Sequence, residues 1–230
     1  MPARVDNPSR QMTVVPAIGD DYRFDPQARI WRRDGGVSLS YTDGERFEAR
    51  LREQLAATTD LGTLSAEIAA MIVDWPSEAH LSGSRANLLR PLSFSPGMRI
   101  LEVGAGCGAL TRYLGETGAS VHALEGAIAR AGCAAERCRD LSNVTVICDE
   151  LTRYRGPVDY DVVMLVGVLE YARLFVEGED PVQAALAHAL KHLSRAGVLL
   201  LAIENQLGLK YFNGCNEDHL GAPYAGVTDL

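Results

Sequence analysis

The chain has 230 residues, 47% of them hydrophobic, and its 30 acidic and 22 basic residues give a formal net charge of −8. This length is enough to bury a sizeable core, in one domain with additions or in two small ones. An acidic chain without a cluster of lysines and arginines does not suit a phosphate backbone, so nucleic acid is not an expected partner.

The lengths of the apolar runs and the spacing of the cysteines indicate the cellular location of the protein. The apolar run 196–203 is far shorter than the roughly 20 residues that a membrane helix needs. The N-terminal sequence "MPARVDNPSRQM" lacks the apolar centre of a signal peptide. Five cysteines form no Cys-x-x-Cys pair, which is typical of a reducing compartment. We therefore expect a cytoplasmic protein with free thiols and no membrane insertion.

The first part of the chain is expected to form a hairpin and helices. Residues 1–20 are polar and aperiodic and are predicted to be a loose leader. Apolar runs flank Asp34-Gly35-Gly36, which predicts a hairpin over 28–41 with its turn at these three residues. Residues 21–92 thus form one N-terminal section, whose predicted helices span 44–59, 63–75 (ended by Pro76) and 82–92 (capped by Ser82 or Ser84).

From Arg99 onward, apolar strands alternate with helical segments. The predicted strands are 99–103, 120–125, 144–148, 161–166 and 198–203, and the predicted helices are 108–117, 127–140 and 181–193. Such alternation is typical of parallel β-α units. The sequence therefore predicts an α/β domain over 93–205 with a doubly wound, mostly parallel sheet.

A glycine-rich loop, "GAGCG" (104–108), connects the first of these strands to its helix. Glycine there permits unusual φ values and lets a ligand approach the backbone closely. Gly104, Gly106 and Ala109 also satisfy the looser dinucleotide-binding pattern. The glycines alone therefore do not choose between a nicotinamide cofactor and another adenosine compound.

Acidic residues at the ends of three strands narrow the choice. An unpaired charge inside an apolar strand would cost roughly 3 kcal/mol or more, so Glu102 is expected to face a cationic group. The amino group of S-adenosylmethionine is such a group, whereas the pyrophosphate of NAD is not. Glu125 lies 21 residues after Gly104, where a carboxylate accepts hydrogen bonds from both ribose hydroxyls. Asp149 and Glu150 follow the third strand, where they are expected to meet adenine.

The segments "ILEVGAGCGALTRYL", "VHALEG", "NVTVICDEL" and "YDVVMLVGVLEYA" resemble the successive motifs of class I S-adenosylmethionine-dependent methyltransferases, over residues 99–205. The resemblance implies a Rossmann-like fold and S-adenosylmethionine as cofactor. The same resemblance implies that Glu102, Gly104 and Gly106 hold the methionine end of the cofactor, which Val166 and Gly167 border. It implies that Glu125 holds the ribose and that Asp149 and Glu150 hold the adenine. It also implies that Ala105 and Gly126 are further cofactor-binding residues.

Two further segments, 73–92 and 202–221, resemble a bacterial methyltransferase group associated with glycan biosynthesis and often joined to glycosyltransferase domains. This resemblance implies a sugar or another small molecule as acceptor, methylated on oxygen or nitrogen, and a glycosyltransferase domain in the same natural chain. Arg85, together with His80, is a candidate to close over the cofactor carboxylate.

The end of the chain carries the candidate catalytic groups. Residues 206–230 begin at the sheet edge where open α/β sheets hold ligands, and they are predicted to include a substrate lid. His219 and Glu204 are candidate bases for a sugar hydroxyl, with His219 ranked first. His188 and His192 lack a carboxylate or cysteine at ligand spacing, so no metal is expected.

Class I methyltransferases usually continue past the fifth strand with a helix and two strands, for which the sequence to Leu230 has no room. An exposed strand edge needs a cover. A C-terminal continuation of the natural chain is the favoured cover, with a second copy or the hairpin of residues 30–41 as alternatives.

Two other functions remain open at this point. One is a non-catalytic module that binds S-adenosylmethionine within a larger multidomain protein, because neither candidate base is compelling. The other is an NAD-dependent oxidoreductase, which Glu102 and the absence of a Tyr-x-x-x-Lys pair argue against.

Overall fold

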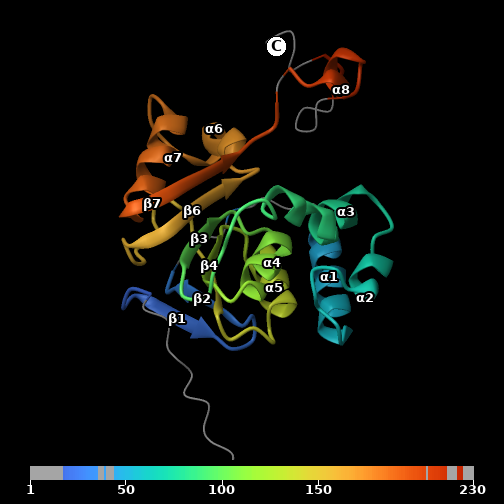
Figure 1. The fold of residues 1–230 in the computed structure, drawn as a ribbon, viewed down its shortest axis with the longest axis horizontal. Coiled ribbons are helices and arrows are strands. Elements are labelled where there is room, and N and C mark those ends of the chain that lie inside the picture. Colours follow the sequence, from blue (N-terminus) through green and yellow to red (C-terminus); the bar gives the residue numbers. More distant parts are fainter. Residues whose placement is uncertain (1–17, 36–38, 40–43, 206, 217–221, 225–230) are drawn as a thin grey trace, which may run out of the picture.

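The computed structural model describes residues 18–35, 39, 44–205, 207–216 and 222–224. Its centre is a seven-stranded sheet with strand order β1-β2-β5-β4-β3-β6-β7 (Figure 1). The strands are β1 (Tyr22–Asp25), β2 (Ile30–Arg33), β3 (Arg99–Val103), β4 (Ser120–Glu125), β5 (Val144–Cys148), β6 (Tyr160–Val166) and β7 (Leu193–Ala202). Strand β1 pairs antiparallel with β2 and the other neighbouring pairs are parallel, which confirms the predicted α/β sheet. Residues 1–17, most of the predicted leader, lie outside the described residues.

Helices cover both faces of the sheet, with α4 and α5 on one side and α6 and α7 on the other (Figure 1). They are α1 (Glu45–Ala57), α2 (Ala66–Ala70), α3 (Trp75–Leu81), α4 (Ala109–Glu116), α5 (Ile128–Arg137), α6 (Ala172–Phe175), α7 (Pro181–Leu190) and α8 (Leu209–Phe212), with 3₁₀ turns η1 (Gly83–Leu88) and η2 (Leu169–Tyr171). None of the helices described combines the length and the apolar character needed to cross a membrane.

Strand β3 is the point at which the strand order reverses. It pairs with β4 on one side and with β6 on the other. The chain leaves β3 into α4 on one face and leaves β6 into η2 and α6 on the other face (Figure 1). In open α/β sheets, such a switch point opens a crevice at the carboxyl ends of the strands.

Alternation along β3 decides which face its carboxylate meets. Leu101 and Val103 join the core that includes Ala189 of α7, whereas Ile100 joins the core formed with Leu114 of α4. Side chains two apart in a strand share a face. Glu102 therefore faces the α4 side, directly below the turn that the glycines form.

A hairpin lies earlier in the chain than the predicted one. The turn of the hairpin formed by β1 and β2 lies between Asp25 and Ile30. The Asp25 carboxylate accepts hydrogen bonds from the backbone amides of Gln27 and Ala28, each at 3.0 Å, and so closes a turn of its own. Gly36 and all of the predicted second arm except Leu39 lie outside the described residues, so the hairpin predicted over 28–41 stays a prediction.

Pro76 begins a helix instead of ending one. The predicted helix 63–75 is replaced by α2, capped by the Ser65 side chain, and by α3, capped by Asp74 in a capping box with Ser77. Proline fits the first turn of a helix, where its missing N–H has no partner to lose. The predicted α1 and the cap of η1 at Ser82 are confirmed, whereas α5 and α7 end three residues early.

The two edges of the sheet differ. Strand β2 extends the sheet beyond β5, with Trp31 opposite Ile147. The hairpin of β1 and β2 therefore lies at the edge opposite β7, so residues 30–35 do not cover β7 as the third alternative expected. The other residues of that alternative, apart from Leu39, lie outside the described residues. On β7, Val198 is 60% exposed and Leu201 44% exposed.

An ion pair fixes the hairpin to the sheet. Arg33 at the end of β2 donates from Nε and Nη2 to the two carboxylate oxygens of Asp149, at 2.9 and 2.7 Å. The Tyr22 hydroxyl donates to the same carboxylate. Asp149 is 4% exposed, so it depends on these partners in place of water.

We predict that Arg33→Ala lowers the free energy of unfolding by about 3 kcal/mol, because it leaves a buried carboxylate without its cation. Urea unfolding measures this difference. Arg32→Ala is the matched control, since Arg32 forms a half-exposed ion pair with Asp25 that is worth less than about 1 kcal/mol. Equal losses in the two variants would contradict the assignment.

Candidate functional site

Two hollows meet at the carboxyl ends of β3, β4 and β6. The first, called the Glu125 pocket, is bordered by the ends of β4 and β5 and by the segment after β6. The second, called the Glu102 pocket, lies between the glycine loop, α3 and η1. Both are bordered by Gly104, Gly106, Arg130, Gly167 and Tyr171, so one elongated ligand can occupy the two together.

The glycine loop requires glycine for two separate reasons. Gly104 has a φ of +74°, and a Cβ there would lie 2.3 Å from Cγ2 of Val168. Gly106 has a φ of +55°, and apart from its chain neighbours only described atoms of His80 lie within 4 Å of where its Cβ would be. A side chain at Gly104 would therefore collide with the opposite wall, and one at Gly106 would fill space beside His80.

Glu102 is buried at the base of its pocket. It is 3% exposed, and its Oε2 accepts a 2.6 Å hydrogen bond from the Thr111 hydroxyl of α4. Burial raises the pKa of Glu102 to about 7, an effect that the Thr111 hydrogen bond partly offsets and that nearby Glu125 increases. A cationic group entering the pocket would favour the ionised form.

Glu125 ends β4 and fixes the glycine loop. Its Oε2 accepts from the backbone amide of Gly106 at 2.7 Å, and its Oε1 accepts from the amide of Ala127 at 2.8 Å. Burial raises the pKa of Glu125, and these two amides counter that rise. A carboxylate has about four acceptor positions, so two remain for donors on a ligand.

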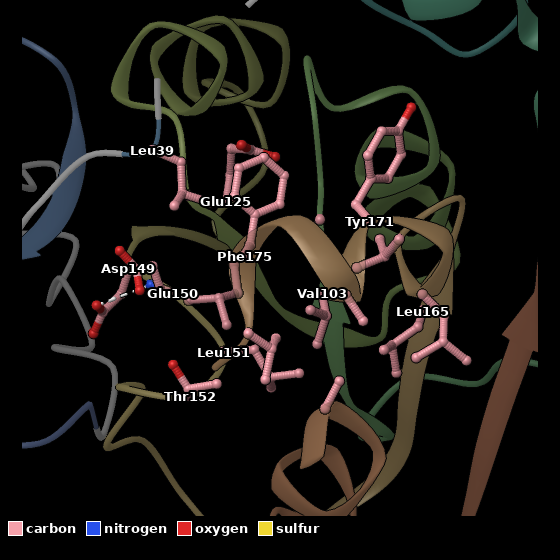
Figure 2. Close-up of a pocket in the computed structure, with 18 of the residues that line it drawn as sticks. Leu39, Val103, Glu125, Asp149, Glu150, Leu151, Thr152, Leu165, Tyr171 and Phe175 are labelled. Atoms are coloured by element: carbon pink, nitrogen blue, oxygen red, sulfur yellow. Dashed lines mark hydrogen bonds between the residues drawn. The ribbon is translucent and has the colours of Figure 1, made fainter. Parts of the chain in front are cut away.

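Asp149 and Glu150 follow β5 at the far end of the Glu125 pocket (Figure 2). The Asp149 carboxylate is already held by Arg33 and Tyr22, and it also accepts from the Glu150 amide at 2.9 Å. The structure therefore gives Asp149 a role in fixing the hairpin that sequence reasoning missed. In the described part of the chain, no hydrogen bond or ion pair occupies the carboxylate of Glu150.

The Glu102 pocket carries groups of both charge signs. Arg85 of η1 and His80 of α3 border it together with Glu102. The His80 ring also lies against Phe47 of α1, with ring centroids 5.8 Å apart. Arg130 borders this pocket too, so the pocket holds a carboxylate and three basic side chains, which suits a ligand that carries an ammonium and a carboxylate group.

The segment after β6 forms a wall that sequence reasoning only partly found. Gly167 turns the chain with a φ of +68°. Tyr171 then borders both pockets, and Phe175 of α6 borders the Glu125 pocket, as do the apolar side chains of Leu151 and Leu169. The aromatic residues of "LEYARLF" directly after an apolar strand were the available signal.

The structure brings all eleven predicted cofactor residues to these two hollows. The Glu125 pocket takes Glu125, Gly126, Asp149 and Glu150, the Glu102 pocket takes Glu102, Ala105, Val166 and Arg85, and Gly104, Gly106 and Gly167 border both. Their contacts with a cofactor stay predictions.

Only one of the two candidate bases, Glu204, is among the described residues. Glu204 borders neither hollow, and its carboxylate accepts from the Tyr211 hydroxyl at 2.5 Å and lies 3.6 Å from Nζ of Lys210. His219 lies outside the described residues, as does part of the predicted lid. Their roles stay predictions.

Metal and disulfide chemistry find little support in the described residues. No cluster of three or more histidine, cysteine or acidic side chains within them is arranged to hold a metal ion. The five cysteines are free thiols, as predicted, and Cys107 of the glycine loop is buried.

Residues 101–199 match a family model described as a methyltransferase domain. This part of the chain is therefore similar to methyltransferase domains. No curated protein matches the sequence significantly.

Solved structures resemble the chain at low identity. Phosphoethanolamine N-methyltransferase 1 of Haemonchus contortus is 18% identical over 71% of this chain and 34% of that one, with a TM-score of 0.48. A TehB-like S-adenosylmethionine-dependent methyltransferase of Corynebacterium glutamicum is 20% identical over 68% of this chain and 70% of that one, with a TM-score of 0.44. The chain thus spans about a third of the length of the Haemonchus protein, and likeness at this level does not extend to substrates.

The raised pKa of Glu102 predicts a pH-dependent stability. The unfolded chain ionises Glu102 near pH 4.5, whereas the folded protein keeps it neutral to about pH 7. Stability should therefore fall by about 3 kcal/mol between these pH values, relative to Glu102→Gln, and stay level above them. Urea unfolding of both proteins from pH 4.5 to 8 measures the difference, and a constant difference would show that Glu102 has an ordinary pKa.

Proposed function

We propose that this chain binds S-adenosylmethionine across the two pockets and transfers its methyl group to a small molecule or a glycan. The observation that carries the proposal is the buried Glu102 carboxyl, which lies next to basic side chains in a pocket joined to an apolar one. The similarity of residues 101–199 to a methyltransferase domain supports the same proposal.

The adenosine end suits the Glu125 pocket. The free acceptor positions of Glu125 are available to two adjacent ribose hydroxyls. Leu151, Leu169 and Phe175 supply apolar surface for the adenine ring, with Glu150 at the far end for its amino group. A phosphate on the ribose would meet the Glu125 carboxylate and be repelled, so this pocket disfavours NADP.

The methionine end suits the Glu102 pocket. Glu102 would accept from the amino group, and Arg85 and His80 would face the carboxylate. Gly106 leaves the space between them open. The reacting centre would then lie where the pockets join, beside Gly167 and Tyr171.

When bound, the cofactor supplies a methyl group already activated by its positive sulfur. The chain's own residues have to hold an acceptor in line with that group and exclude water. Tyr171 borders both pockets and is therefore placed to limit access to the point where they meet. Positioning thus accounts for most of the catalysis in this proposal.

The resemblance of residues 73–92 and 202–221 to methyltransferases of glycan biosynthesis supports a sugar or another small molecule as the acceptor. A neutral amine needs no base, whereas a sugar hydroxyl gains about 10² to 10⁴ in rate from one. His219 remains the first candidate and Glu204 the second. A cytoplasmic location and a glycosyltransferase domain in the natural chain belong to the same proposal.

The position of Glu204 outside both pockets favours one alternative, a non-catalytic module that binds the cofactor within a larger protein. Incubation with methyl-labelled S-adenosylmethionine and a panel of sugars, lipid-linked glycans and amines would separate the two. Label transfer that His219→Ala abolishes supports the enzyme, and tight cofactor binding without transfer to any acceptor supports the module.

Cofactor choice is the first test of the proposal. S-adenosylhomocysteine should raise the melting temperature, whereas NAD should leave it unchanged. The affinity for S-adenosylhomocysteine should also increase from pH 6 to pH 8, because ionisation of Glu102 creates the partner for its amino group. The affinity of Glu102→Gln should be weaker and flat over this range. A melting temperature raised by NAD alone would contradict the proposal.

We further predict that Glu125→Ala weakens S-adenosylhomocysteine binding by about 1 to 3 kcal/mol, because charge-assisted hydrogen bonds to the ribose are lost. Calorimetry on folded protein measures this. Glu116→Gln is the control, since Glu116 is a carboxylate of α4 that borders neither pocket. Unchanged affinity in Glu125→Ala would remove Glu125 from the ribose site.

A further inference from the structure

Arg137, at the end of α5, is completely buried and donates to the end of another helix. Its exposure is 0%. Its Nη1 donates to the backbone carbonyl of His80 at 2.7 Å, and its Nη2 donates to that of Leu81 at 3.2 Å. These are the last two residues of α3, whose carbonyls have no partner within the helix. One guanidinium group therefore satisfies the carboxyl end of α3.

The burial of this charge is unusual. No carboxylate of the described residues forms an ion pair with Arg137, and its Nε has no hydrogen-bond partner among them. Burial lowers the pKa of Arg137 to about 10. A charge buried without a counterion is expensive, so simple packing does not account for an arginine at this position.

The segment that Arg137 holds forms one side of the Glu102 pocket. Trp75, Ala79 and His80 of α3 border this pocket, and so does Arg85 of η1. Ser82 joins the two elements, since its amide bonds back to Glu78 and its hydroxyl caps η1. Arg137 thus fixes the backbone at His80 and at Leu81, which lies four residues before Arg85.

We propose that Arg137 is a positioning residue that sets His80 and Arg85 for the amino-acid end of the cofactor. This inference rests on the proposed function. Arg137 itself borders neither pocket, so its effect passes through the α3 backbone. It should therefore influence recognition of the amino-acid end and leave recognition of the adenosine end unchanged.

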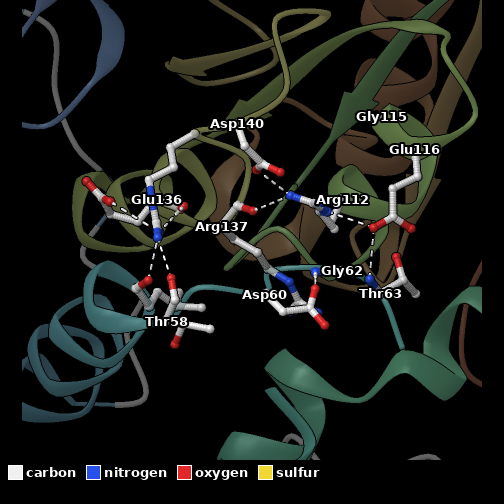
Figure 3. Close-up of polar contacts among 12 residues, drawn as sticks. Thr58, Asp60, Gly62, Thr63, Arg112, Gly115, Glu116, Glu136, Arg137 and Asp140 are labelled. Atoms are coloured by element: carbon white, nitrogen blue, oxygen red, sulfur yellow. Dashed lines mark hydrogen bonds and ion pairs between the residues drawn. The ribbon is translucent and has the colours of Figure 1, made fainter. Parts of the chain in front are cut away.

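A second arginine of this region, Arg139, provides a matched control, and Figure 3 shows Thr58 and Glu136, whose carbonyls it contacts. Arg139 donates from Nη1 to the carbonyl of Leu55 at 2.7 Å and from Nη2 to the carbonyl of Thr58. It thus holds the end of α1 as Arg137 holds the end of α3.

None of the described side chains of α1 borders either pocket. Phe47, which packs against His80, lies in the first turn of α1, eight residues before Leu55, so loss of the contact at the other end of the helix should affect mainly stability.

The two halves of the cofactor can be separated with two probes. S-adenosylhomocysteine carries the amino-acid end, and 5′-methylthioadenosine lacks it. Calorimetry gives the affinity of each for the wild type, Arg137→Lys and Arg139→Lys. Lysine keeps the charge but lacks the planar fork that reaches two carbonyls.

The proposal predicts that Arg137→Lys weakens S-adenosylhomocysteine binding about tenfold, as expected when one hydrogen-bonded contact is misplaced. Binding of 5′-methylthioadenosine should change less than about twofold, and Arg139→Lys should leave the ratio of the two affinities at the wild-type value. If Arg137→Lys does not fold, Arg137→Gln gives the same comparison, since it removes the buried charge and keeps one donor group.

Three results would overturn the proposal. An Arg137 variant that keeps the wild-type ratio would show that the residue is structural only. If Arg139→Lys lowers the ratio of S-adenosylhomocysteine affinity to 5′-methylthioadenosine affinity as much as Arg137→Lys does, the effect comes from a general loosening of the N-terminal helices. A wild type that binds neither probe would overturn the proposed function and the positioning role with it, which distinguishes this failure from the other two.

Discussion

A carboxyl group buried in the central strand of a parallel sheet is the constraint on which the site depends. Glu102 faces α4, where Thr111 supplies one hydrogen bond but no charge. The glycine loop above it cannot carry side chains at Gly104 without collision. Strand, loop and helix are thus arranged around a carboxyl group that the protein alone does not fully satisfy, and a cationic ligand would complete it.

The second carboxylate, Glu125, stabilises the same loop in a different way. It is bound by the amides of Gly106 and Ala127 and so joins the end of β4 to the loop after β3. The loop is therefore shaped before any ligand arrives. Glu125 thus shapes the site, whereas the charge state of Glu102 depends on the ligand that enters it.

Arginines connect the sheet domain to the elements before it in the chain. Arg33 attaches the hairpin through Asp149, and Arg137 and Arg139 attach α3 and α1 through backbone carbonyls. The parallel sheet provides the ends of the strands, and these contacts bring the N-terminal section against them. The Glu102 pocket exists only because both sections meet.

Sequence reasoning predicted the parts of the molecule that depend on local patterns. Apolar runs closed by glycine or an acidic residue gave β3, β4 and β5 with the bounds that the structure shows. The Arg33–Asp149 pair joins residues 116 positions apart, and no local pattern indicates it. Tyr171 lies in the 3₁₀ turn η2 and Phe175 in the four-residue helix α6, both too short to show a helical period, so their place in the pocket wall came only from the structure.

A crystal structure of the chain with S-adenosylhomocysteine tests the central claim most directly. The account predicts adenosine in the Glu125 pocket and the amino group of the homocysteine end within hydrogen-bond distance of Glu102, directly or through one water. A ligand bound elsewhere, or one whose amino group points away while Glu102 keeps Thr111 as its partner, would contradict it.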